Sequence, residues 1–269
     1  MSFKVNKYNI LKMKKLLLLL VIISTLFSCK KEDDDTEAVC TPGYTTISGH
    51  IITSGNTPLK GVELQLKYVE TRWLASYHSW LKRETTTDAN GSYKMSFNIK
   101  DNEVESFEGQ SSSYFELQID FRNLDPDKYF LPEQISETGT SYSYNPIISL
   151  KRDTVYDVSF YIPTKDYITV TLKNYKPTNQ SDHFEVQTFF PWGAKSDEKK
   201  MLNTEYGISS SGYDHFVAKD ENQTFRNVPV ARNDTNIVRI IKMKNGVAYP
   251  EDYKIFVPEK NTIELTYEY

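Results

Sequence analysis

Hydrophobic and polar positions alternate with a period of two in several short stretches of the chain. From residue 62 to residue 68 the apolar positions are Val62, Leu64, Leu66 and Tyr68, and the polar positions between them are Glu63, Gln65 and Lys67. Residues 168–172 repeat the pattern with Ile168, Val170 and Leu172. Because successive side chains of a β-strand point to opposite faces, this period predicts half-buried antiparallel strands.

Short apolar runs separated by turn residues extend this pattern over most of the chain. In the first half we predict strands at residues 45–52, 61–70, 80–87, 92–99, 114–121 and 156–162. In the second half we predict strands at 167–174, 183–190, 212–218, 223–225, 236–243, 253–256 and 262–267. With Pro163-Thr164-Lys165 as a linker, the expected fold is all-β, with two tandem antiparallel β-sandwich domains of the immunoglobulin or transthyretin type at 45–163 and 166–269.

Two Asn-Gly pairs mark turns next to predicted strands. Asp88-Ala89-Asn90-Gly91 separates two of them. The Asn-Gly pair favours a two-residue type I′ hairpin, because both central residues of that turn need a positive φ. Lys244-Asn245-Gly246 is a second turn that leads into a strand.

The beginning of the chain is organised as a secretion signal. Residues 16–27, LLLLLVIISTLF, carry no charge, and Lys14 and Lys15 precede them. A membrane-spanning helix needs about 20 apolar residues. The run is therefore too short to span a membrane and instead predicts a signal peptide at residues 1–28. MKKLLLLL is a complete signal opening by itself, so translation starts at Met1 or at Met13.

The end of the apolar run resembles the lipobox of bacterial lipoproteins, with Leu26, Phe27 and Ser28 before Cys29. The resemblance implies diacylation of the Cys29 thiol, and two acyl chains give a stable membrane anchor. An ordinary secreted protein with an unrelated cysteine is the alternative. The sequence has two cysteines, so a lipidated Cys29 leaves Cys40 without an intramolecular partner. Cys40 is then a small apolar residue at the start of the fold, or it forms an intermolecular disulfide.

The charge distribution is that of an exported chain with a flexible acidic tether at residues 29–44. The sequence has 32 Lys+Arg and 36 Asp+Glu, and residues 1–28 hold five of the lysines and no acid, so the remainder has a net charge of −9. Such a chain is a poor partner for nucleic acid. The tether resembles the export tag of surface lipoproteins in the Bacteroidota phylum, through Lys30, Lys31, Glu32, Asp33, Asp34 and Asp35. The resemblance implies a lipid-anchored, surface-exposed location on the outer membrane, and a periplasm-facing tether is the alternative.

Three motifs, in order, resemble the carboxypeptidase regulatory-like domain. They are Ile47-Ser48-Gly49-His50-Ile51, Asn56-Thr57-Pro58-Leu59-Lys60-Gly61-Val62-Glu63-Leu64 and Thr86-Thr87-Asp88-Ala89-Asn90-Gly91-Ser92-Tyr93. The resemblance covers residues 45–125 and extends towards 163. It implies a rigid, non-catalytic, transthyretin-like β-sandwich. Residues 69–84 form a longer insert than this family has.

The insert is rich in aromatic residues. Its large apolar side chains recur at helical spacing, although a strand hairpin with aromatics on one face fits as well. Trp73, Tyr77 and Trp80 are candidate ligand contacts that stack on sugar rings, with His78 and Arg83 at the rim. A fourth candidate is Trp192, in the loop Pro191-Trp192-Gly193. The alternatives are that the insert packs its aromatics onto the sandwich and that Trp192 caps one of its ends.

The sequence carries no recognisable catalytic or metal-binding motif. The histidines, His50, His78, His183 and His215, are not arranged as His-Glu-x-x-His or another ligand pair, although a cross-strand pair of the last two is conceivable. We therefore expect no catalytic residue, no cofactor and no metal. Asp153-Thr154-Val155 resembles an O-glycosylation site of the same phylum at Thr154, and the start of a strand is the alternative.

These features predict a non-catalytic surface lipoprotein that acts as a binding or accessory module for a glycan or a surface protein. The alternative is a structural subunit, similar to those of pili or fimbriae, that pairs strands between chains. The alternating strand at 262–267 lies at the end of the sequence and suits such donation, or it closes its own sandwich.

Overall fold

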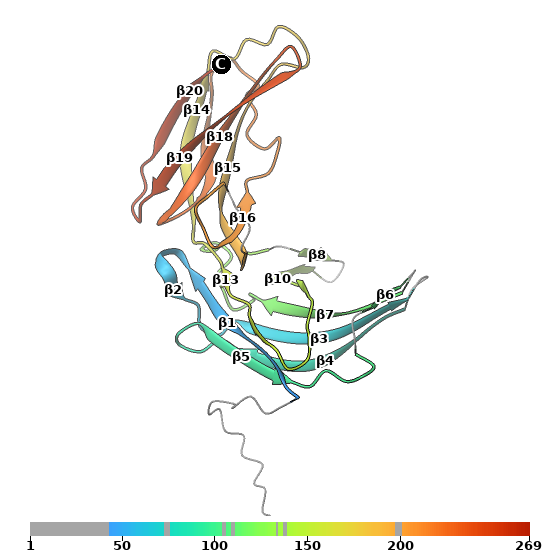
Figure 1. Cartoon of the computed structure of the whole chain (residues 1–269). Helices are drawn as coiled ribbons and strands as arrows, with labels where there is room; N and C mark the ends of the chain where they lie inside the picture. Colours follow the sequence, from blue (N-terminus) through green and yellow to red (C-terminus); the bar gives the residue numbers. More distant parts are fainter. Residues whose placement is uncertain are drawn as a thin grey trace, which may run out of the picture. The chain divides into compact units, whose positions relative to one another are not determined.

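The computed structural model describes residues 43–72, 76–103, 106–108, 111–132, 134–136, 139–196 and 201–269. The predicted signal peptide, Cys29, the predicted export tag, Cys40 and Trp73 lie outside the described residues. Regular structure within them consists of β-strands and one 3₁₀ turn, η1 (Ser54–Asn56), which confirms the all-β prediction (Figure 1). No helix in the described part is long and apolar enough to cross a membrane.

The strands follow one another in two groups along the chain. The first group is β1 (Thr45–Thr53), β2 (Thr57–Pro58), β3 (Glu63–Arg72), β4 (Ser76–Thr86), β5 (Ser92–Phe97), β6 (Ser106–Glu108), β7 (Ser111–Asp120), β8 (Gln134–Ser136), β9 (Gly139–Ser141), β10 (Ser143–Tyr144), β11 (Ile147–Ile148), β12 (Val155–Asp157) and β13 (Phe160–Tyr161). The second group is β14 (Lys165–Lys173), β15 (His183–Lys195), β16 (Tyr206–Ser210), β17 (Gln223–Ala231), β18 (Asp234–Lys244), β19 (Val247–Val257) and β20 (Glu264–Glu268).

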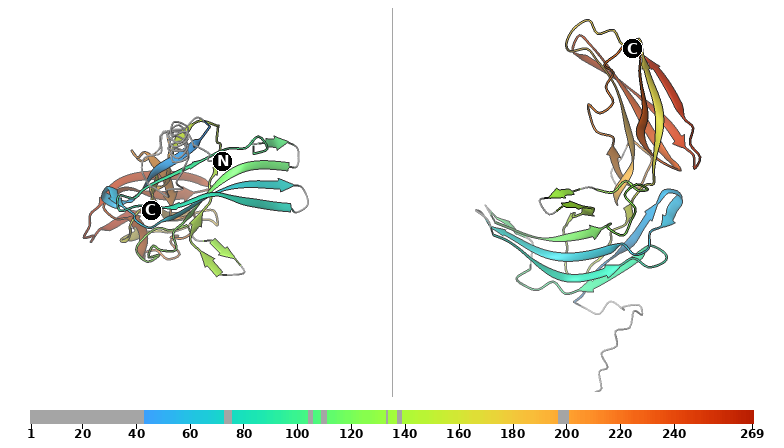
Figure 2. Two further views of the ribbon diagram at one scale, coloured as in Figure 1. Left: turned by 90° about the horizontal axis from the view of Figure 1, so that it is seen from below. Right: turned by 180° about the vertical axis from the view of Figure 1, so that it is seen from behind.

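These strands form a long sheet and three smaller ones. The nine-stranded sheet has the order β12-β1-β13-β15-β18-β19, with β2 and β5 paired to β1 and β16 paired to β15. A six-stranded sheet has the order β10-β7-β3-β4, a three-stranded sheet has the order β17-β14-β20, and β8 pairs with β9. β3 lies between β4 and β7, and the three run side by side as a curved sheet (Figures 1 and 2).

Two separate hydrophobic cores lie between these sheets. The first core contains Phe97, Phe115 and Phe160 and lies where β1 and β5 face the six-stranded sheet. The second core contains Phe184 and Ile240 and lies where β15 and β18 face the three-stranded sheet. Each core is formed by strands that bury one face, as the alternating pattern predicts.

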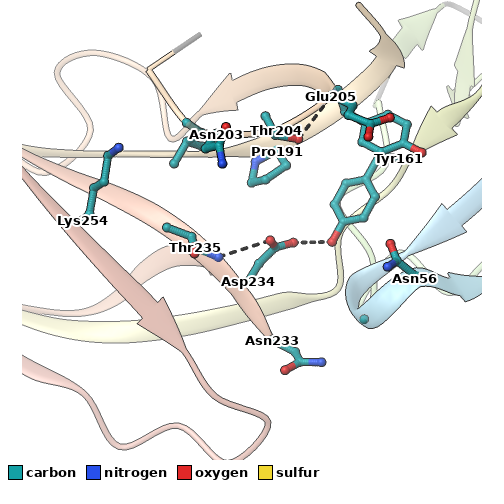
Figure 3. Close-up of a pocket in the computed structure, with 13 residues that line it drawn as sticks. Asn56, Tyr161, Pro191, Asn203, Thr204, Glu205, Asn233, Asp234, Thr235 and Lys254 are labelled. Carbon is teal, nitrogen blue, oxygen red and sulfur yellow. Dashed lines mark hydrogen bonds between the residues drawn. The ribbon is translucent and has the colours of Figure 1, made fainter.

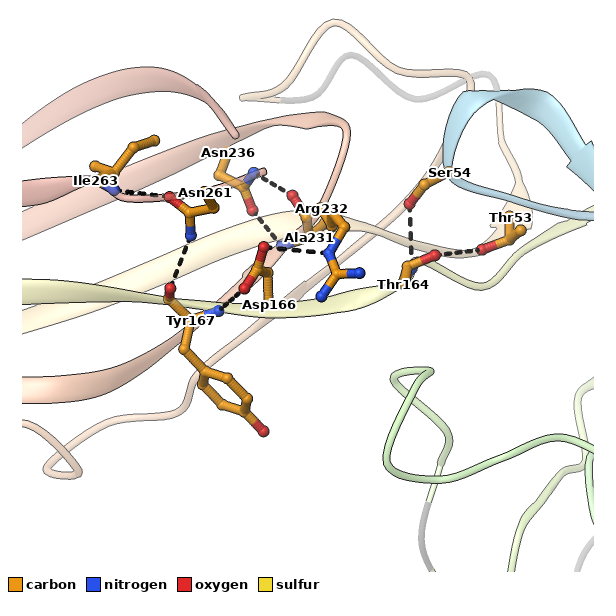
Figure 4. Close-up of polar contacts among 10 residues, drawn as sticks. All are labelled: Thr53, Ser54, Thr164, Asp166, Tyr167, Ala231, Arg232, Asn236, Asn261 and Ile263. Carbon is orange, nitrogen blue, oxygen red and sulfur yellow. Dashed lines mark hydrogen bonds and ion pairs between the residues drawn. The ribbon is translucent and has the colours of Figure 1, made fainter. Parts of the chain in front are cut away.

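One short strand joins the two parts of the long sheet. β13 pairs in parallel with β1, through Ile51↔Phe160 and Ile52↔Tyr161, and antiparallel with β15, through Phe160↔Ala194 and Tyr161↔Gly193. The expected linker at 163–165 is hydrogen-bonded at the same place. The Thr164 hydroxyl lies 3.2 Å from that of Thr53, and the Thr164 N–H donates to Ser54 Oγ at 3.1 Å (Figure 4).

The turn at Asp88–Gly91 differs from the predicted type I′ hairpin. Gly91 has a φ of 69°, but Asn90 is not among the residues with positive φ. The Asp88 carboxylate accepts the N–H groups of Asn90 at 2.7 Å and Ser92 at 2.9 Å, so a side chain supplies the turn's acceptor. The turn carries the chain from β4 in one sheet to β5 in another. The type I′ geometry occurs at Asn245-Gly246 instead, with φ of 52° and 78° between β18 and β19.

Two further local predictions are corrected by the structure. The insert forms the hairpin of β3 and β4, with Val69 opposite Ser79, so the strand alternative holds and the helical one is wrong. Residues 212–218 are not a strand, because Gly212 and Asp214 adopt positive φ values of 86° and 60°. The strand of this region is β16, which pairs with β15.

Candidate ligand-binding site

A groove of about 430 Å³, which we call the aromatic groove, opens beside β3 and β4. Its walls come from these strands and from the loop that follows β5. The lining residues are Tyr68, Glu70, Trp80, Leu81, Lys82, Lys100, Asn102 and Glu103. The groove therefore combines aromatic walls with charged and amide groups.

A β-bulge places the charged part of the groove. Leu66 pairs with Arg83 and Lys67 pairs with Leu81, so Lys82 is the extra residue on β4. An extra residue interrupts the alternation and redirects a side chain. Lys82 Nζ contacts both carboxylate oxygens of Glu103, at 2.7 and 2.6 Å, and the two side chains are only 11% and 9% exposed.

The Lys82 contact controls the charge of Glu103. Burial by itself would raise the pKa of Glu103, but the hydrogen bonds from Lys82 and the Lys100 N–H, with the charges of both lysines, outweigh burial and hold the pKa below its ordinary value. Glu103 is therefore ionised at neutral pH and accepts hydrogen bonds.

The aromatic wall presents an exposed ring. The Trp80 residue is 48% exposed, and its ring stacks on Tyr68 at a centroid distance of 6.0 Å and an interplanar angle of 28°. Tyr68 is held in place by its hydroxyl, which donates to the Asn102 carbonyl oxygen at 3.1 Å. A flat ring fixed beside hydrogen-bonding groups can stack on the apolar face of a ring ligand while the polar groups bind its hydroxyls.

The structure separates the predicted contacts of the insert. Trp80 and His78 lie on one face of β4, where their rings stack at 6.0 Å. Tyr77 is 58% exposed, and the alternation of the strand directs it to the opposite face. Arg83 is also engaged, since its Nε donates to the Ser96 carbonyl oxygen at 3.0 Å.

The other predicted contacts lie away from this groove. Trp192 packs half-buried against the first core, and its indole N–H donates to the Phe130 carbonyl oxygen at 2.8 Å. Trp192 is therefore engaged in packing, and its role as a ligand contact stays a prediction. Thr154 precedes β12, and its hydroxyl donates to the Arg152 carbonyl oxygen at 2.9 Å.

A second cavity, of about 550 Å³, lies where η1 meets the strands of the second group (Figure 3). The Tyr161 hydroxyl donates to Asp234, and the Tyr161 ring stacks on Tyr206 at 5.2 Å. Burial, followed by the hydrogen bond to Asp234, raises the pKa of Tyr161 well above its ordinary value. Burial likewise raises the pKa of Asp234. The Tyr161 hydroxyl and the Asp234 carboxylate are hydrogen-bonded to each other, so we assign the pair a structural role rather than a ligand-binding one.

The structure also brings together a group that the sequence did not predict. His183 Nε2 lies 2.8 Å from Glu185 Oε2 and 3.9 Å from Asp214 Oδ1. His183 and Glu185 are two apart on β15, a spacing that could have indicated a shared face. Asp214 comes from the loop at the wrongly predicted strand, so its approach could not be predicted. His215, the partner that we had considered for His183, lies beside Gly212 instead.

Comparison with known proteins identifies no family. No family model matches the chain, and no curated protein matches it. Similar solved structures include a 9R-lipoxygenase from Cyanothece PCC8801 (16% identity, 58% of this chain, 23% of that chain, TM-score 0.28). They also include the Streptococcal ancillary pilin, with 13% identity over 87% of this chain and 62% of that chain and a TM-score of 0.26. A shaft pilin SpaA mutant from Lactobacillus rhamnosus GG has 11% identity over 83% of this chain and 96% of that chain, with a TM-score of 0.28. The chain thus spans about a quarter of the lipoxygenase and about three fifths of the ancillary pilin, and at these TM-scores the likeness carries no conclusion about function.

Proposed function

We propose that this chain is a non-catalytic binding module, anchored to the outer membrane by lipid on Cys29, and that its aromatic groove binds carbohydrate. The observation that carries the carbohydrate proposal is the exposed ring of Trp80 beside the Lys82–Glu103 ion pair. The anchor and the surface location rest on the lipobox and the acidic tether of the sequence. The motifs shared with the carboxypeptidase regulatory-like domain support a rigid scaffold under the groove.

The groove suits a polyhydroxylated ring better than a purely apolar ligand. Trp80 and Leu81 supply exposed apolar surface, at 48% and 54% exposure. Glu70, Asn102 and the ion pair supply acceptors and donors at the same opening. A few placed polar groups set orientation and specificity in an otherwise apolar site. A sugar ring has a matching apolar face with hydroxyls around its rim.

Replacing Trp80 with alanine should weaken carbohydrate retention. The measurement is native gel electrophoresis of the purified full chain in gels that contain soluble xylan, mannan, pullulan or laminarin. Loss of the stacked ring should weaken binding by about tenfold, as aromatic stacking contributes up to about 1.5 kcal/mol. Tyr77→Ala is the matched control, because it removes an exposed aromatic from the other face of the same strand.

Two outcomes would contradict the carbohydrate proposal. One is a wild-type chain that migrates identically with and without every polysaccharide. The other is equal loss of retention in Tyr77→Ala and Trp80→Ala, which would place the contact elsewhere or show a general effect on folding. Circular dichroism of each variant distinguishes a contact located elsewhere from a general effect on folding.

A structural subunit is the second candidate function. β4 and β20 each end a sheet, and an edge strand exposes backbone groups that can pair with another chain. β20 already pairs in parallel with β14 of its own chain, from Thr169↔Glu264 to Lys173↔Glu268, so donation would require its release. Light scattering after size-exclusion chromatography should therefore show a monomer, and concentration-dependent polymers would favour the subunit.

A further inference from the structure

His183, Glu185 and Asp214 bring three potential metal-ligand atoms close together, and we call these residues the His183 cluster. The three atoms, one from each side chain, all lie within 4.8 Å of one another. His183 and Glu185 share one face of β15, and Asp214 reaches it from the loop between β16 and β17. The cluster is independent of the aromatic groove and does not rest on the proposed function.

Glu185 is an unusually buried acid, with 2% exposure. Its Oε1 is occupied, because it accepts the Gln187 side-chain amide at 3.0 Å and the Asp214 N–H at 2.9 Å. These donors fix the plane of the carboxylate and turn Oε2 towards His183 Nε2. Hydrogen bonding of the second carboxylate oxygen is a common feature of carboxylates that bind metals.

The buried carboxylate of Glu185 needs polar partners on both oxygens, because a buried polar group without partners is strongly unfavourable. The nearby Arg239 lies opposite Gln187 but makes a bidentate ion pair with Asp252, at 2.6 and 2.8 Å. An Nε2 lone pair directed at Glu185 Oε2 would be repulsive, so the 2.8 Å contact needs either a hydrogen on Nε2 or a metal cation between the two atoms.

We propose that the His183 cluster binds Zn²⁺ through His183 Nε2, Glu185 Oε2 and Asp214 Oδ1, with water as the fourth ligand. Imidazole nitrogen with two carboxylates is a donor set that zinc accepts, and three protein ligands with one open position is a common arrangement. Ligands about 2.0–2.1 Å from a tetrahedral zinc lie roughly 3.4 Å apart. The present separations of 2.8 and 3.9 Å bracket this value, and the exposed Asp214 side chain is free to adjust.

Zinc titration of the purified full chain tests this site. Free thiols are first alkylated, because a thiol at Cys40, or at a Cys29 that carries no lipid, would bind zinc itself, and the protein is freed of metal with a chelator. We expect one equivalent of Zn²⁺ to bind and a rise in the melting temperature, and Co²⁺ in its place should give the visible absorption of a tetrahedral site. His183→Gln and Asp214→Asn should each weaken binding at least tenfold. Asparagine tolerates the left-handed backbone of residue 214, so Asp214→Asn keeps the loop.

His78→Gln is the matched control, since it removes an exposed histidine on β4 and should leave zinc affinity unchanged. The proposal is overturned if the alkylated wild-type chain binds no zinc. It is equally overturned if the folded double variant His183→Gln/Asp214→Asn binds zinc as tightly as the wild type does. Either result would assign the cluster to a hydrogen bond from His183 Nε2–H to Glu185.

Discussion

Replacing Gly49 with alanine should destabilise the chain by about 3 kcal/mol or more, the largest effect that we expect from a single methyl group. Gly49 is buried in β1, at the point where its parallel neighbour is interrupted between β12 and β13. A Cβ at this position would lie 2.3 Å from the Val158 carbonyl oxygen and 2.6 Å from its carbon. Both are backbone atoms, so no side-chain rotation relieves the overlap.

The contacts around Val158 add to this cost. The Val158 N–H donates to the Ser48 carbonyl oxygen at 2.8 Å, and the Tyr93 hydroxyl donates to the Val158 carbonyl oxygen at 2.5 Å. Moving Val158 away from an alanine would break these bonds and loosen the edge of the first core.

Urea unfolding followed by circular dichroism measures the effect of Gly49→Ala. Gly61→Ala is the control, because a Cβ at Gly61 meets nothing within 4 Å and the φ of 79° alone carries the cost. We expect about 1 kcal/mol for that left-handed position. Equal losses in the two variants would show that the close approach of Val158 does not limit residue 49.

Replacing Lys82 with methionine should destabilise the chain by about 3 kcal/mol at neutral pH, because it leaves the buried Glu103 without its partner. The double variant Lys82→Met/Glu103→Met removes both charges and should recover to within about 1 kcal/mol of the wild type. An exposed pair gives the comparison. Lys242→Met, which breaks the 3.2 Å contact with Glu251, should cost less than about 1 kcal/mol.

The pH dependence of the Lys82→Met variant gives a second measurement. In the wild type the folded-state pKa of Glu103 is lowered, so its contribution to stability is present above the unfolded-state pKa and is lost as pH falls through the folded-state pKa. In Lys82→Met only the Lys100 N–H and the charge of Lys100 still oppose the effect of burial, so protonation of Glu103 becomes more favourable than in the wild type. The stability difference between the two proteins should therefore shrink in acid. A difference that is independent of pH, or a double variant as unstable as the single one, would contradict the ion-pair explanation.

Local periodicity predicted most of the strands. Alternation at Val62–Tyr68 and Ile168–Leu172 corresponds to β3 and β14, and the strand predicted at 236–243 lies in β18. The predictions failed where the same short sequence pattern is compatible with two different local structures. Asn90-Gly91 lies in a turn between two sheets, where the Asp88 carboxylate accepts the Asn90 N–H. At residues 212–218 the left-handed backbone of Gly212 and Asp214 is incompatible with a strand.

The candidate sites were predicted only in part. Trp80 is exposed beside a groove, as its aromatic surroundings suggested, but Tyr77 points to the other face of β4. The Lys82–Glu103 pair depends on a bulge, and a bulge has no signature in the hydrophobic pattern of one strand. The His183 cluster depends on a loop that returns to β15 about 30 residues later along the chain.

The sequence by itself determined the all-β class and the alternating faces of the strands, because both depend on neighbouring residues. The lipid anchor that we propose at Cys29 rests on the sequence alone. Only the tertiary structure decided that β13 joins β1 to β15 in one long sheet and that Trp192 packs against the first core. It also decided that Gly49 lies against the backbone of Val158. The physical reason is that strand pairing is non-local. A strand's pattern specifies which face is buried but not which strand, often more than 100 residues away, supplies the hydrogen bonds.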